Sequence, residues 1–368
     1  MQSLPQFKRL HALDALRGIA VLLMIPTHLF VFGGGTTSIF GEGGSSQLNY
    51  MLPIYNARPW GTGLLLFFFV TGVALATVIA SKRGIKPFSG IAKREIIRYS
   101  SYILLGAVTE FLVYFVIYGQ TDLAKIVQRI FGLSFLSVSQ PIIGLGFSAI
   151  ISLPLIYKLS WRKLLPAALA MAVVEGLILL LVTFPNVSST TPSSELWGTA
   201  LMRMLFAAPF AIFKGIPIVL YGAAMGGLLK EKGTIKKIYF VIAGIISIGF
   251  ILVPAVVNMN FWHMIFVIWS YPLAMPFIAA SCLFCYGLFT FVEAKGRSIS
   301  IFQVLGRNSL IVYYGHFIFL LILITVLGAM GYEITIQIMM TEMFASTIAI
   351  WIIAFFYSKW RWGDPKNW

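Results

Sequence analysis

The chain has 368 residues, of which 59% are hydrophobic and only 11% are charged. Its mean hydropathy of +0.90 excludes an ordinary soluble globular domain and indicates a polytopic membrane protein. The formal net charge of +15 is better explained by basic cytoplasmic loops than by nucleic-acid binding. We therefore expect an all-α, multi-pass protein of the plasma membrane, with membrane lipids as partners and no nucleic acid.

Apolar runs long enough to cross a bilayer recur along the whole chain. We predict ten transmembrane helices, near residues 14–33, 62–81, 99–118, 137–157, 164–184, 214–230, 237–257, 267–291, 302–327 and 340–358. With a cytoplasmic N-terminus, the outer segments hold only five of the 27 basic residues, namely Arg58, Lys125, Arg129, Arg203 and Lys214. This asymmetry predicts that both termini are cytoplasmic. No soluble segment interrupts the pattern, so residues 1–368 are predicted to form one transmembrane domain.

The first predicted span carries three ionisable residues, Asp14, Arg17 and His28. An ionisable side chain inside a membrane is costly and is a candidate functional residue. At 100° per residue all three lie on one face, with Arg17 and His28 roughly 16 Å apart along the helix axis. Asp14 and Arg17 are spaced to form an ion pair at one membrane surface. The imidazole near the middle of the membrane is suited to act as a general base.

A second polar stripe lies in the ninth predicted span, where Ser309, Tyr313 and His316 share one helix face. His316 is therefore a second candidate base. His11 precedes the first span and is interpreted as incidental, and His263 is interpreted as part of a short outer loop.

Two acidic residues, Glu110 and Glu175, fall inside the third and fifth predicted spans. Each fits either a structural hydrogen bond between helices or part of a proton path. Cys282 and Cys285 form a single C-x-x-C pair, and no second pair completes a tetrahedral site, so no metal is expected.

The inner segment from Lys82 to Arg98 is strongly basic and has two interpretations. It can set the topology and contact anionic lipids. Alternatively, together with Arg17, Arg129 and Arg307, it can bind a phosphorylated cytosolic substrate. The chain has no Gly-rich phosphate loop, so nucleotide hydrolysis has no support.

Several of these stretches resemble known membrane enzymes. LDALRGIAVLLMIPTH (13–28) is similar to the opening of the transmembrane acyltransferase superfamily, where an Arg and a His with ten residues between them occupy the first helix. Five other segments resemble the heparan-α-glucosaminide N-acetyltransferase branch of that superfamily. They are GGG (33–35), WG (60–61), FFFVTGVALA (67–76), KIVQRIFGLSF (125–135) and GRNSLIVYYGHFIF (306–319). Together these matches cover roughly half the chain. One departure is that the heparan-type enzymes carry a His just before the WG pair, where this chain reads NARP (56–59).

The resemblance implies transfer of an acetyl group from cytosolic acetyl-CoA to a sugar or glycan on the outer side, by O- or N-acylation. It implies that His28 is the general base or acyl carrier, and that His316, Asp14 and Arg17 are the other catalytic residues. Acetyl-CoA would be held by Arg17, Arg94, Arg98, Arg129, Arg307, Asn308 and Tyr313, and the acceptor by Arg58, Trp60 and Lys214. A homodimer would be compatible with this resemblance.

Two other functions fit the same residues. A transporter or flippase would use Glu110, Glu175 and Lys214 as its pathway. A catalytically inactive scaffold would bind lipids or partners without consuming a thioester.

Overall fold

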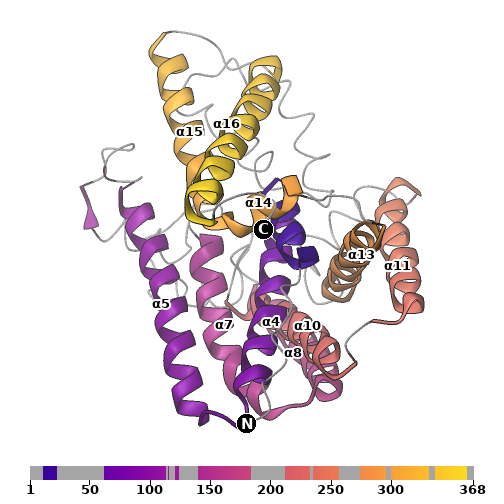
Figure 1. Ribbon diagram of the computed structural model, residues 1–368. Coiled ribbons are helices and arrows are strands. Elements are labelled where there is room, and N and C mark those ends of the chain that lie inside the picture. The colour runs from indigo at the N-terminus through magenta and orange to yellow at the C-terminus, as the bar shows by residue number, and fades with distance from the viewer. Residues whose placement is uncertain are drawn as a thin grey trace. The chain divides into compact units, whose positions relative to one another are not determined.

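The computed structural model describes residues 11–22, 62–112, 115, 121–123, 140–183, 212–232, 235–256, 274–295, 300–330 and 336–362 (Figure 1). Within these ranges the regular structure is helical, which confirms the predicted all-α class. Besides the helical segment 11–22, the helices are α4 (Thr62–Lys82), α5 (Phe88–Leu112), α7 (Gln140–Lys158), α8 (Trp161–Thr183), α10 (Ile212–Lys232), α11 (Lys237–Val256), α13 (Ala274–Ala294), α14 (Ser300–Arg307), α15 (Ser309–Ala329) and α16 (Ile336–Trp362).

Most helices begin and end within a few residues of a predicted apolar run, and two differences stand out. α5 begins at Phe88 rather than near residue 99. Its first turns are rich in Lys, Arg and Glu, which favour helix strongly and extend it beyond the apolar section. The predicted ninth span is two helices, because α14 and α15 are separated at Asn308. The Asn308 amide donates to the carbonyl of Val304, a bond of the kind that lets Asn compete with continuous helix.

The chain forms two compact units. The central unit comprises Phe67–Ser281, and the terminal unit comprises Met1–Leu66 with Cys282–Trp368. In the central unit α10 packs against α7 and α8, and α7 packs against α5. In the terminal unit α14 and α15 pack against α16. The prediction of one domain over residues 1–368 stays a prediction.

Glycines bring two helices of the central unit into backbone contact. A Cβ on Gly72 of α4 would clash with the carbonyl oxygen of Val219 in α10. A Cβ on Gly222 of α10 would clash in the same way with the carbonyl oxygen of Phe69. Small residues at such crossings are typical of helices that associate in a membrane, where backbone proximity replaces the hydrophobic effect.

The described helices expose apolar side chains and bury polar ones. On α8, Val173 and Val174 are 48% and 54% exposed, whereas Glu175 is 2% exposed. On α5, Leu104 is 65% exposed and Glu110 is fully buried. Exposed apolar side chains next to a buried acidic one are uncommon on the helices of a soluble protein.

Two windows of the described helices are long and apolar enough to cross a membrane, Leu65–Lys82 and Pro276–Ala294. Two further apolar helical stretches, Ile142–Lys158 and Lys237–Gly249, are shorter. The number of ten spans and the orientation of the chain therefore stay predictions.

Candidate functional site

Two glycines hold the N-terminal helix against α14 in the terminal unit. A Cβ on Gly18 would overlap the backbone of Phe302, and a Cβ on Gly306 would overlap the carbonyl group of Asp14. The two helices therefore cross with their backbones in direct contact, which requires residues without a side chain. The crossing brings Asp14 next to Arg307, although 293 positions separate them in the sequence.

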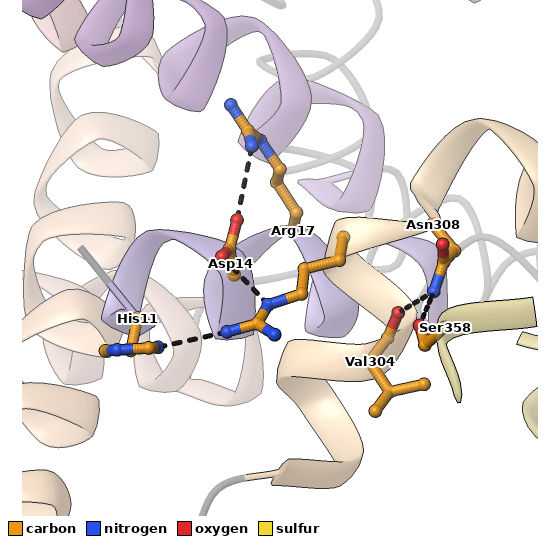
Figure 2. Close-up of polar contacts among 7 residues, drawn as sticks. His11, Asp14, Arg17, Val304, Asn308 and Ser358 are labelled. Carbon is orange, nitrogen blue, oxygen red and sulfur yellow. Dashed lines mark hydrogen bonds and ion pairs between the residues drawn. The ribbon is translucent and has the colours of Figure 1, made fainter. Parts of the chain in front are cut away.

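Asp14 links two arginines (Figure 2). Its Oδ1 lies 3.4 Å from Nη1 of Arg17, and its Oδ2 lies 3.4 Å from Nε of Arg307. The first contact confirms the predicted Asp14–Arg17 pair, and the second joins two motifs that the sequence analysis treated separately. Arg307 has a second contact in this cluster, because its Nη2 lies 3.3 Å from Nδ1 of His11.

The two arginines differ in burial. The Arg17 side chain is 27% exposed, whereas the side chains of Arg307 and Asp14 are 2% and 6% exposed. Ion pairs that water reaches are weak, whereas removing one member of a buried pair leaves a charge that nothing solvates. The pair between Asp14 and Arg307 is therefore the structural centre of this cluster.

His11 is a residue whose place the sequence analysis missed, because we interpreted it as incidental. A guanidinium nitrogen can only donate, so Nδ1 of His11 is the acceptor in this contact. The signal for this role was present in the spacing. His11 precedes Asp14 by three residues and so lies on the same helix face.

Asn308 joins α14 and α15 to α16. Its amide nitrogen lies 2.8 Å from the carbonyl oxygen of Val304 and 2.5 Å from Oγ of Ser358 (Figure 2). The carbonyl oxygen of Ala354 is 3.2 Å away. Asn308 and Ser358 are both buried. The amide thus satisfies polar groups inside the fold, and its predicted contact with acetyl-CoA stays a prediction.

His316 is fully buried in α15 beside Tyr313, whose ring meets the imidazole edge-on at 5.7 Å between centroids. Nδ1 of His316 lies 2.9 Å from the carbonyl oxygen of Val312. A carbonyl oxygen only accepts, so Nδ1 carries the proton, and in the neutral ring the lone pair is on Nε2. The role of His316 as a general base stays a prediction.

The remaining predicted site residues lie in the central unit or outside the described residues. Arg94 and Arg98 belong to α5 of the central unit, where Nη1 of Arg98 lies 3.6 Å from Oε2 of the buried Glu95. Lys214 lies on α10, and its side chain is outside the described part. Also outside the described residues are His28, Arg58, Trp60, Arg129, Arg203 and His263.

Comparison with known proteins adds no relative: no family model matches the chain, and no curated protein sequence matches it. Within the described ranges no three His, Cys, Asp or Glu side chains gather as metal ligands. The predicted absence of a metal stays a prediction.

Proposed function

We propose that this protein is a multi-pass plasma-membrane acyltransferase. It moves an acetyl group from cytosolic acetyl-CoA to a sugar or glycan on the outer side. The membrane location is supported by α5 and α8, whose apolar side chains are exposed. The same two helices bury the acidic residues Glu110 and Glu175. In the proposed arrangement ten helices span the bilayer, and both termini are cytoplasmic, as the distribution of Lys and Arg predicts.

The ion pair between Asp14 and Arg307 is the observation that carries this proposal. The two stretches with the most specific resemblance to transmembrane acyltransferases are LDALRG at 13–18 and GRNSL at 306–310. Nothing in the sequence requires them to meet, yet Gly18 and Gly306 pack their helices together and the side chains pair. A shared site accounts for both motifs at once.

The proposed roles follow the charges. Arg17 and Arg307 would bind the phosphates of acetyl-CoA, since a guanidinium matches phosphate oxygens with paired donors. The contribution of Arg94, Arg98 and Arg129 stays a prediction from the sequence. Asp14 would hold the first two arginines in position. The predicted separation of roughly 16 Å between Arg17 and His28 suits the long pantetheine arm, which would carry the thioester toward the middle of the membrane.

The proposed reaction is attack by a hydroxyl or amine of the acceptor on the thioester carbonyl carbon. His28 takes the proton of the acceptor, the C–S bond breaks, and CoA leaves as a thiolate that is then protonated. A two-step route through acetyl-His28 gives the same products. Tyr313 would stabilise the negative charge on the carbonyl oxygen, and Asn308 and His316, whose own donors are bonded within the fold, would line the same wall. Arg58, Trp60 and Lys214 would face the acceptor.

The test measures acetyl-CoA consumption by the purified full chain, with cell-envelope glycans as the acceptor pool. His28→Ala and His316→Ala are each compared with His263→Ala, a matched change in a predicted outer loop. We expect the first two to lose about 100-fold or more in rate, as loss of a general base does. Full activity in both variants would overturn the assignment.

A transporter or flippase is the second candidate, and the burial of Glu110 and Glu175 favours it. Buried carboxylates within membrane helices often carry protons or substrate. This function requires movement of a substrate without consumption of a thioester. Thermal stabilisation by acetyl-CoA distinguishes the acyltransferase from the transporter, because only a protein that binds the ligand gains stability from it. An inactive scaffold, like a transporter, would show no stabilisation.

A further inference from the structure

The turn between α4 and α5 has a well-defined backbone. Gly84 adopts a left-handed conformation with φ 89°, which ends α4 as glycine commonly does. The amides of Ile85 and Lys86 both donate to the carbonyl oxygen of Lys82 at 3.0 Å. These bonds raise Ile85 to the tip of the turn, where its side chain is 59% exposed between Arg83 and Lys86.

Arg83 is held in place by an aromatic ring of α7. Its guanidinium carbon lies 5.3 Å from the centroid of the Tyr157 ring, and the same ring contacts Phe88 with 4.6 Å between centroids. A cation over the face of an aromatic ring is attracted by the ring. The exposed Arg83 side chain is therefore held beside the turn before a ligand arrives.

The surroundings of the turn are strongly positive. Glu95 is the carboxylate that the described structure places among these cations, and it is buried and paired with Arg98. On the same α5 segment, Ile96 and Ile97 are 41% and 62% exposed. The exposed cations of the patch are Arg83, Lys86, Lys93, Arg94 and Arg98.

We propose that the α4–α5 turn binds the phosphate headgroup of an anionic phospholipid, with Arg83 and Lys86 on the phosphate and Ile85 inserted among the acyl chains. Charge complementarity selects an anionic partner, and the isoleucine between the two cations favours a lipid over a soluble phosphate compound, which would leave it in water. The inference rests on the membrane location in the proposed function. It does not depend on acyl transfer.

The test uses the full chain, delipidated in neutral detergent, and follows its melting temperature during titration with phosphatidylglycerol, phosphatidylcholine or acetyl-CoA. We expect phosphatidylglycerol to stabilise the protein and phosphatidylcholine to have little effect. Each cation near a membrane surface changes affinity by roughly fivefold, so Arg83→Gln with Lys86→Gln should weaken the apparent affinity for phosphatidylglycerol about 30-fold. The matched control, Lys236→Gln with Lys237→Gln, removes the same charge from two other exposed positions and should leave the affinity unchanged.

Because Arg83 also packs on Tyr157, Lys86→Gln alone serves as a second variant, with an expected loss of about fivefold. Equal stabilisation by the two lipids, or wild-type affinity in both variants, overturns the lipid site. The lipid site is also overturned if acetyl-CoA competes with phosphatidylglycerol for binding and both variants abolish that competition. The turn would then be a nucleotide site. If acetyl-CoA still stabilises the protein while phosphatidylglycerol does not, the lipid site falls and the proposed function stands. If phosphatidylglycerol stabilises the protein while acetyl-CoA does not, the lipid site stands and the proposed function falls.

Discussion

Replacing Asp14 with Asn should destabilise the protein far more than replacing its exposed partner. Asp14→Asn removes the carboxylate that contacts the buried Arg307 guanidinium, and loss of one partner from a buried pair costs about 3 kcal/mol or more. Arg17→Gln removes a guanidinium that lies at the same 3.4 Å from the same carboxylate but is 27% exposed. That change should cost less than ~1 kcal/mol. The two variants thus compare burial at equal distance.

Thermal unfolding of the purified variants in detergent, with the total free-energy change obtained from denaturant titration, measures these differences. Arg307→Gln should lower the free energy of unfolding by an amount between those of the other two variants, because the Asp14 carboxylate still contacts Arg17. The double variant Asp14→Asn with Arg307→Gln should cost less than the sum of the single changes, since it leaves no buried charge unpaired. Equal effects of Arg17→Gln and Asp14→Asn would refute the reasoning, and strict additivity in the double variant would do the same.

Three further predictions concern packing, a polar junction and pH. Gly306→Ala should cost about 1–3 kcal/mol or prevent folding, because its Cβ meets the Asp14 backbone, whereas Gly315→Ala has open space and should be neutral or stabilising by up to about 1 kcal/mol. Asn308→Leu should lower stability by about 1–3 kcal/mol by leaving buried acceptors unpaired. Glu231 accepts a 2.6 Å bond from the indole of Trp161, which lowers its pKa, with Lys232 and Arg162 acting in the same sense.

For the last prediction the sign follows from the direction of the shift. A lowered pKa in the folded protein means that the contribution of Glu231 is present above its unfolded pKa and is lost as pH falls through the folded value. Acid titration should therefore change the Trp161 component of the fluorescence in wild type, and Glu231→Gln should abolish that transition. An unchanged titration in Glu231→Gln would contradict the assignment.

Melting temperatures check the other two. Equal stability of the Gly306→Ala and Gly315→Ala variants would show that the backbone crossing is not tight. Wild-type stability of Asn308→Leu would show that the junction with α16 does not depend on the amide.

The apolar runs alone predicted where the described helices lie, because a hydrophobic stretch of about twenty residues satisfies its backbone polar groups only as a helix in a membrane. The same reasoning predicted the Asp14–Arg17 pair, since a spacing of three residues on one helix is local geometry. It could not predict that α5 starts at Phe88 or that the helix breaks at Asn308. Both depend on side chain propensities and bonds that hydropathy ignores.

The contacts across the terminal unit were decided by tertiary structure. In the sequence Arg307 is far from His11 and Asp14, and nothing local joins positions almost three hundred residues apart. Only the close approach of backbones at Gly18 and Gly306 brings them together, and only the resulting burial distinguishes Arg307 from Arg17. The amino-acid sequence determined the helical class and which residues carry charge. The helix crossing at Gly18 and Gly306 determined which of those charges pair away from water, where loss of a partner has its largest effect on stability.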